Sequence, residues 1–255
     1  MLNFAAFLHL ITCLIKSSFD FFLHRTRHSL FQITEISEDR RREIEQATRP
    51  QSSSKRWMEE RSKRITSSHF GEVCKATTRN LTDLAKSLMS PKSLSTVPMR
   101  HGLKYESVAI EEFEKINGKT TPSGLIVHPS FPYLAATPDA LYGSDSVVEV
   151  KCPFAARDRQ ITPESVPYLT YVGNDLMLKQ NHDYFYQVQG QMFCSSRSVC
   201  YFCVYTFVDF RIIPIHKDDT FIDFSVMHRL QHFFDFHLRP ALVEKFCYRN
   251  YNKFF

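Results

Sequence analysis

This chain of 255 residues has few of the residues that mark several classes of protein. Only 7 glycines and 12 prolines are present, which excludes a low-complexity or fibrous chain. The 7 cysteines are odd in number and scattered without the spacing of a disulfide framework. We therefore expect free thiols in a reducing, intracellular compartment, with nucleus and cytoplasm left undistinguished.

The chain also lacks the charge pattern of a secretory leader and the length of a membrane span. Residues 1–15 are largely apolar and carry no formal charge, so the basic start of a signal peptide is missing. Lys16 and Asp20 interrupt this run before the roughly 20 apolar residues that a spanning helix needs. We expect no membrane partner. Residues 1–42 form an apolar and then charged segment that could be a leader, an anchor or a product of the gene boundaries.

Apolar residues make up 43% of the chain and aromatic residues 14%, which is enough for a bulky core. Lysine and arginine exceed aspartate and glutamate by 32 to 27, a mild excess that suits a polyanionic partner without proving one. Helices are expected at 67–76, 81–89, 102–116, 181–194 and 220–246, the last interrupted at Pro240, and strands at 124–128, 133–136, 147–152, 199–207 and 210–216. This order predicts an α/β fold with a mixed central β-sheet flanked by helices.

Cys200 and Cys203 have the spacing of a zinc half-site but lie in the expected strand 199–207. Residues three apart on a strand point to opposite faces, so the two thiols are not expected to chelate one ion. We expect both cysteines in the core or at its edge.

Glu106 breaks the amphipathic pattern of the expected helix 102–116. On a helical wheel it lies on the apolar side with Ala109, Ile110 and Phe113, whereas the other charged residues of this helix lie on the far side. A carboxylate on an apolar face needs a cation, a hydrogen-bond donor or a raised pKa. A buried ion pair is the structural alternative to a functional role.

The expected strand 147–152 places Glu149 and Lys151 on one face and three apolar residues on the other. Taken alone, this pair is typical of a salt bridge on a solvated sheet. Asp139 follows Pro138 at the end of another strand, and a tight turn through Gly143 would return the chain beside it. Two carboxylates and one lysine therefore converge near a hairpin end, with Glu106 available from a neighbouring helix.

These three carboxylates are hard oxygen ligands without histidine or cysteine among them. Such a set indicates a Mg²⁺ or Mn²⁺ site that is open to water and to a substrate phosphate. Lys151 could orient or help to deprotonate the attacking water and could neutralise charge on the scissile phosphate.

Two further segments carry candidate residues. In the expected helix 181–194, Gln187 shares one side with Gly190, Gln191 and Cys194, and could hold the water or a phosphate oxygen without adding charge. Upstream, Arg61, Arg64 and Ser68 belong to a basic, hydroxyl-rich stretch that leads into a helix with Ser67 or Ser68 as its cap. Helix N-termini with nearby arginines suit phosphate, although solvated faces of the molecule explain both segments equally well.

Taken together, these motifs resemble the YqaJ-like viral recombinase family, relatives of the lambda exonuclease within the PD-(D/E)XK nucleases. The matching segments are Arg61 with 65–68, 102–106, Pro138-Asp139, 149–151 and 186–189, and the resemblance covers about 45 to 246. We assign 43–250 to the domain on this basis. The resemblance implies a restriction-endonuclease-like core.

The resemblance also implies roles for individual residues. Mg²⁺ would be bound by Asp139, Glu149 and the Val150 carbonyl with Glu106 nearby. Lys151 and Gln187 would assist the water, whereas Arg61, Ser68 and Arg64 would contact a DNA terminal phosphate. The expected activity is that of an exonuclease on duplex DNA ends, in recombination, repair or mobile-element processing, and the expected assembly is a homo-oligomer, by resemblance a trimer.

The residues alone allow three other interpretations. The same core could belong to an endonuclease, which a circular substrate would distinguish. A DNA-binding module that has lost catalysis would be expected to lack some of the five residues Glu106, Asp139, Glu149, Lys151 and Gln187, yet all are present. The misplaced Glu106 and the order of the motifs together disfavour an inert globular protein whose charged pairs are ordinary salt bridges.

Overall fold

The computed structural model describes residues 35–77, 80–90 and 96–251, with side chains as far as Lys245. The apolar run at 1–15 lies outside these residues. No helix within the described ranges is both long and apolar enough to cross a membrane.

A five-stranded mixed sheet forms the centre of the protein, in the order β10-β9-β6-β5-β2. Its strands are β2 (Thr121–Pro122), β5 (Ala140–Tyr142), β6 (Ser146–Lys151), β9 (Val199–Tyr205) and β10 (Phe210–His216). The pair β6 and β9 is parallel and the other pairs are antiparallel. A smaller sheet contains β1 (Ile65–Thr66), β4 (Leu134–Ala136) and β3 (Ile126–Val127), and β7 (Leu169–Val172) pairs with β8 (Asp175–Leu178) as a hairpin.

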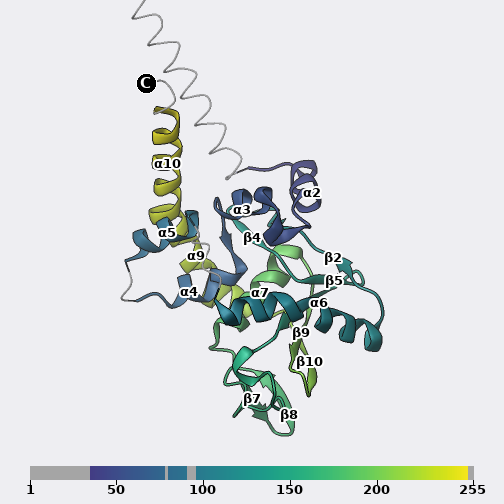
Figure 1. The fold of residues 1–255 in the computed structure, drawn as a ribbon. Coiled ribbons are helices and arrows are strands. Elements are labelled where there is room, and N and C mark those ends of the chain that lie inside the picture. Colours follow the sequence, from purple (N-terminus) through teal and green to yellow (C-terminus); the bar gives the residue numbers. More distant parts are fainter. Residues whose placement is uncertain (1–34, 78–79, 91–95, 252–255) are drawn as a thin grey trace, which may run out of the picture.

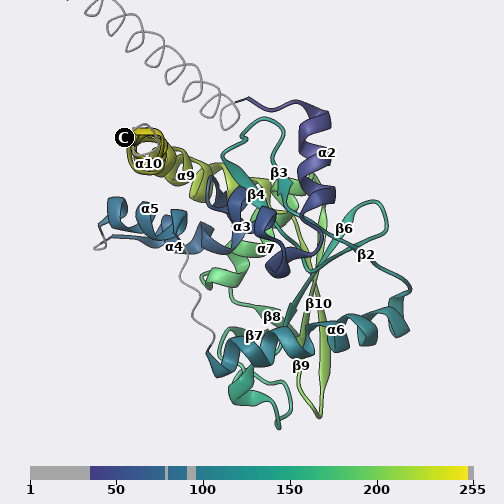
Figure 2. The same ribbon diagram turned by 45° about the horizontal axis from the view of Figure 1, so that its top comes forward.

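Two helices enclose the central sheet, one on each face (Figures 1 and 2). Helix α6 (Val97–Asn117) packs Ala109 and Phe113 against a cluster with Val148 and Val150 of β6. Helix α7 (Asp183–Ser195) packs Val188 and Met192 into a separate cluster with Val147 and Phe202. Side chains alternate along β6, so adjacent valines contact helices on opposite faces of the sheet. The predicted α/β class, with a mixed central sheet flanked by helices, is confirmed.

The turn between β5 and β6 is the tight return that the sequence predicts. Gly143 has a φ of +54°, a left-handed conformation that glycine adopts without the steric cost of a Cβ atom. The antiparallel register pairs Ala140 with Val148. Asp139, one residue before β5, is thereby placed beside the strand that carries Glu149 and Lys151.

Both buried cysteines of β9 lie where the alternation predicts. Cys200 packs with the α7 cluster and Cys203 with the α6 cluster, so their side chains are on opposite faces of the sheet. Both are free thiols. The expectation that they do not form a shared zinc site is consistent with this placement.

Helix α2 (Glu38–Ala47) crosses the expected boundary between residues 42 and 43. The Ser37 side chain caps it by accepting from the backbone N–H of Arg40, and Ile44 packs in a cluster with Leu125 and Val127. At Gly124 a Cβ atom would lie 1.8 Å from the Glu45 carbonyl oxygen, so only glycine permits this approach. Ile36 packs against the same cluster, so packing on the core begins before residue 43.

Several expected boundaries are wrong. Ser67 and Ser68 do not cap the following helix, because 67–69 form the 3₁₀ turn η2 (Ser67–His69) and α4 (Phe70–Lys75) begins only after it. At Gly190 a Cβ atom would lie 2.6 Å from the Phe70 ring and 3.0 Å from the Ser67 Cβ, so η2 and α4 pack closely on α7 at this turn. Helix α6 begins at Val97, earlier than expected, with Thr96 as its cap. The other helices here are α3 (Lys55–Arg61) and α5 (Leu81–Met89), the latter as predicted.

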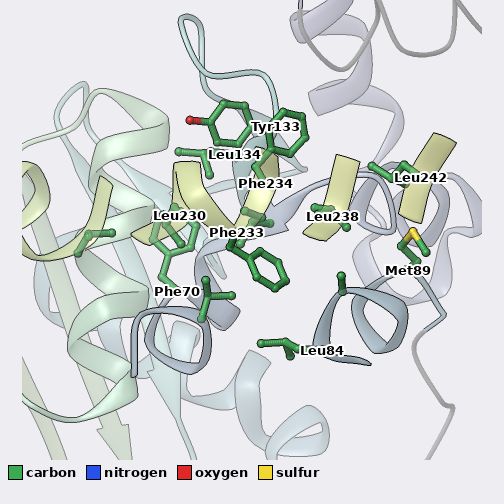
Figure 3. Packing of buried hydrophobic residues seen from close by; sticks show 14 of the residues in the cluster. Phe70, Leu84, Met89, Tyr133, Leu134, Leu230, Phe233, Phe234, Leu238 and Leu242 are labelled. Carbon is green, nitrogen blue, oxygen red and sulfur yellow. The ribbon is translucent and has the colours of Figure 1, made fainter. Parts of the chain in front are cut away.

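The C-terminal helix continues past Pro240, contrary to the expected interruption. It comprises α8 (Asp219–Phe221), η4 (Ile222–Met227), α9 (His228–Phe233), η5 (Phe234–Leu238) and α10 (Arg239–Tyr251), where η4 and η5 are π-helical. The wide turn of η5 directly precedes the proline and accommodates its ring and missing N–H. Leu230, Phe233 and Leu238 pack with Phe70 and Leu84 of α4 and α5 (Figure 3).

Candidate active site

Glu149 is the centre of the hydrogen-bonded network at the end of β6. Its carboxylate is buried and forms an ion pair with Lys151. The Gln187 Nε2 group donates to Oε1 at 2.6 Å, and the Gln191 Nε2 group donates to Oε2 at 2.5 Å. Because the two glutamines are one turn apart on α7, one helix face holds both carboxylate oxygens.

Asp139 is anchored to the same strand. Its backbone N–H donates to the Val148 carbonyl at 3.1 Å, and its Oδ2 accepts from the Val150 N–H at 2.7 Å. Burial raises the pKa of Asp139 well above its ordinary value, and the charges of Glu149 and Glu106 raise it further. The carboxylate is therefore close to two others.

Glu106 reaches this group from α6. Burial raises the pKa of its carboxyl group and the nearby Glu149 charge adds to the effect, while Lys151 opposes it. The side chain that broke the amphipathic pattern thus lies among charged residues contributed by other elements.

Lys151 compensates part of this negative charge. Burial alone would lower its pKa, but Glu149 and Asp139 outweigh burial and raise it above the ordinary value. The ammonium group also lies 4.5 Å from the centre of the Tyr184 ring. A protonated lysine suits the binding of phosphate and the orientation of water better than the removal of a proton.

These groups line a cavity of about 470 Å³ that is open to solvent. Glu106, Asp139, Lys151 and the strand residue Val150 form one part of its wall. The remaining wall is mainly apolar or aromatic, and is formed by Pro98, Met99, Gly102, Leu103, Cys152, Pro153, Phe154, Tyr168 and Tyr184. The cavity can therefore admit a polar group to the carboxylates from outside.

The donor set fits a hard divalent cation. Burial and neighbouring carboxylate charge raise the pKa of Glu106 and Asp139, and a bound cation would offset this cost of ionisation. As the side chains stand, no three His, Cys, Asp or Glu residues in the described ranges are grouped closely enough to hold a metal ion. Both oxygens of Glu149 are already engaged by Lys151, Gln187 and Gln191.

The residues expected to contact a terminal phosphate separate into two groups. Arg61 forms a hydrogen bond of 3.3 Å to Ser68 and lies 4.3 Å over the Trp57 ring. Burial lowers the pKa of Arg61 to about 10, so it remains charged at neutral pH. Among the described residues it forms no ion pair, and with Arg64, Thr66 and Glu72 it lines a cavity of about 210 Å³. These features suit an anion.

Arg64 is bonded within the protein, and its expected role as a phosphate ligand stays a prediction. Only 3% of it is exposed, and its guanidinium donates to the Glu60 carboxylate at 2.6 Å and to the Pro132 carbonyl at 2.9 Å. Burial would raise the pKa of Glu60, but Arg64, Lys63 and Arg56 outweigh it and lower that pKa. The arginine therefore joins α3 to the loop before β4.

Sequence reasoning missed two contacts of the site. Gln191 was noted only as a neighbour of Gln187 on its helix face, although it binds the second oxygen of Glu149. The separation of four residues was the available signal. The contact of Tyr184 with Lys151 depends on how α7 lies against β6 and had no signal in the local pattern.

Comparison with known proteins identifies the family to which this chain belongs. Residues 56–198, more than half of the 255, match the family model described as YqaJ-like viral recombinase domain. No curated protein sequence matches the chain. The chain is similar in fold to LHK-Exo, an alkaline exonuclease from Laribacter hongkongensis, with 22% identity, a TM-score of 0.60, and coverage of 79% of this chain and 100% of that one.

Two other solved structures share the fold. LHK-Exo in complex with dAMP has 24% identity and a TM-score of 0.60, covering 78% of this chain and 98% of that chain. KSHV SOX in complex with RNA has 14% identity and a TM-score of 0.51, covering 86% and 76%. With the matching family model, the ordered motifs and the mixed sheet all in agreement, the chain belongs to the YqaJ-like viral recombinase family.

Proposed function

We propose that this protein is a metal-dependent deoxyribonuclease that hydrolyses phosphodiester bonds at the ends of duplex DNA. The observation that carries the proposal is the convergence of Glu106, Asp139 and Lys151 on one open cavity, beside the buried Glu149. The match of this chain to the YqaJ-like family model supports a DNA nuclease. A role in recombination, repair or mobile-element processing and a trimeric assembly are parts of the same proposal.

The proposed cofactor is Mg²⁺, with Mn²⁺ as a substitute. Asp139, Glu149 and the Val150 carbonyl would hold it, with Glu106 nearby. A bound ion of this kind supplies Lewis-acid polarisation of the phosphate and lowers the pKa of water.

The side chains divide the remaining tasks. The Lys151 ammonium binds and neutralises the scissile phosphate. Gln187 and Gln191 fix the orientation of the Glu149 carboxylate. The proposed role of Gln187 also includes holding the attacking water or a phosphate oxygen.

Arg61 and Ser68 supply the proposed recognition of a DNA end. Arg61 is desolvated and pairs with no carboxylate in the described part of the chain, which favours a phosphate, because a phosphate accepts strong charge-assisted hydrogen bonds. Relatives in fold include LHK-Exo in complex with dAMP and SOX in complexes with DNA and RNA, which supports a nucleic-acid ligand for this chain.

The first experiment compares linear and covalently closed circular duplex DNA, each incubated with purified protein and Mg²⁺. Degradation of the linear form alone, prevented by EDTA, is the expected result. Cutting of the circle would instead make the protein an endonuclease at the same site. If neither form is cut but DNA is still bound, the protein is a binding module and the proposed activity is wrong.

Replacing Arg61 tests the end-recognition part separately. We expect Arg61→Ala to slow digestion of DNA with 5′-phosphorylated ends about 10- to 100-fold, the effect of losing one or two charged hydrogen bonds. DNA with 5′-hydroxyl ends should be affected much less. Arg42→Ala is the matched control, because Arg42 is 65% exposed and pairs with Glu38 on α2. An equal loss on both kinds of end would refute phosphate recognition by Arg61.

A further inference from the structure

A cluster of partly exposed rings extends from the active-site cavity along the first turns of α6. We call His101, Tyr105, Phe154 and Phe207 the aromatic patch. The His101 ring lies 4.7 Å from Tyr105, 5.4 Å from Phe154 and 5.6 Å from Phe207, and Tyr105 lies 4.9 Å from Phe207. Phe154 also lines the active-site cavity. The patch is therefore continuous with the cavity wall.

The exposed ring of the patch is held in place by its backbone. Phe207 is 45% exposed, in the turn between β9 and β10 that lies near α6 in Figure 2. Its N–H donates to the Arg157 carbonyl at 2.7 Å, and the neighbouring Thr206 hydroxyl donates to the Arg159 carbonyl at 2.9 Å. The Asp209 carboxylate accepts from the Ile161 N–H at 2.9 Å. An apolar ring is thus presented to solvent on a fixed loop.

The charges beside the patch are mainly positive. Lys104 is exposed and lies 5.2 Å from the Tyr105 ring, and Arg157 lies 4.4 Å over the Phe154 ring. Asp158 is the acidic residue whose charge raises the pKa of His101, and it forms an ion pair with Arg157. Burial and then Arg157 lower the pKa of His101, so its imidazole is a neutral ring near pH 7. Flat rings interspersed with cations are the surface that binds unpaired nucleic-acid strands.

We propose that the aromatic patch stacks unpaired bases of the DNA strand that lies next to the active-site cavity. This inference rests on the proposed action on DNA and adds a contact to the bases, which the carboxylates and Arg61 do not provide. Every base has a π-face, so the contact would be independent of sequence. It would hold a frayed or single-stranded segment while the neighbouring phosphate occupies the cavity.

The test measures equilibrium binding by fluorescence anisotropy in an Asp139→Asn background, where the probe is not degraded. One probe is a labelled oligothymidylate and the other has the same backbone with abasic sugars. We expect Phe207→Ala to weaken binding of the thymidylate about tenfold, the effect of one lost stacking contact, and to leave the abasic probe unaffected. Phe207→Trp should retain tight binding. Phe224→Ala is the matched control, because Phe224 is 84% exposed on the C-terminal helix.

Other outcomes overturn the proposal. Equal weakening on both probes, or none, would exclude base stacking at Phe207. If Phe207→Ala alters the sedimentation of the protein without altering thymidylate binding, the patch is a contact between copies of the chain. Should Phe207→Ala fail to fold, His101→Ala carries the same expectation.

The proposed nuclease activity is checked in parallel with native Asp139. If the protein with native Asp139 digests DNA but the patch variants bind the thymidylate as tightly as the parent, only the proposed role of the aromatic patch is refuted. Absence of both cleavage and DNA binding would refute the proposed function as well.

Discussion

Asp139→Asn is expected to reduce DNA cleavage by about 10³-fold or more, the scale of losing several kcal/mol of charge stabilisation in the transition state. The amide keeps the shape of the side chain and can still accept the hydrogen bond from the Val150 N–H. It removes one of the carboxylates proposed to hold the metal. DNA affinity should change little, because Arg61 and the aromatic patch are untouched.

The same substitution should make the metal-free protein more stable. The pKa of Asp139 is raised in the folded state, so the ionised form costs free energy at neutral pH and a neutral amide avoids that cost. We expect the Tm in EDTA to rise by a few degrees.

Digestion rate, anisotropy and thermal unfolding together check the prediction, with Asp175→Asn on the exposed part of β8 as the control. Normal cleavage by Asp139→Asn would show that the active-site assignment is wrong.

Lys151→Met is expected to slow cleavage about 10²- to 10³-fold, the effect of removing one preorganised electrostatic contact in an active site. Here stability should change in the opposite direction. The methionine fills a similar volume but leaves Glu149 and Asp139 without their neighbouring cation, and loss of one partner of a buried pair costs about 3 kcal/mol.

The control for Lys151→Met is Lys119→Met, because Lys119 is 88% exposed and pairs with Glu114 at the surface. Urea unfolding in EDTA and single-turnover cleavage measure the two effects. A Lys151→Met protein that is as stable as the parent would contradict the compensation of Glu149 and Asp139 by this lysine. Undiminished cleavage would remove Lys151 from the proposed catalytic group.

The two substitutions act on one cluster of charge and should shift stability in opposite directions. A site that had evolved for stability alone would not bring Glu106, Asp139 and Glu149 so close that burial and mutual repulsion raise the pKa of two of them. Functional sites commonly carry this kind of cost. Added Mg²⁺ should therefore stabilise the parent protein more than Asp139→Asn, if the proposed metal site is correct.

Local pattern in the sequence was sufficient for the central layers of the fold and for the residues around the cavity. The period of two in β6 and the period of 3.6 in α6 are properties of neighbouring residues, so they predict which side chains share a face. The position of Glu106 on the apolar side and the glycine turn after β5 follow from the same local rules. Motif order then placed these residues in a family, with roles that stay predictions.

Tertiary packing decided the rest, because these features depend on contacts between residues far apart in the chain. The burial of Arg64 depends on the Pro132 carbonyl, and the 3₁₀ turn before α4 lies where α7 packs closely at Gly190. Continuation of the C-terminal helix through Pro240 depends on a π-helical turn. The aromatic patch joins α6, η3 (Phe154–Ala156) and the β9–β10 turn, and no single segment of the sequence contains it.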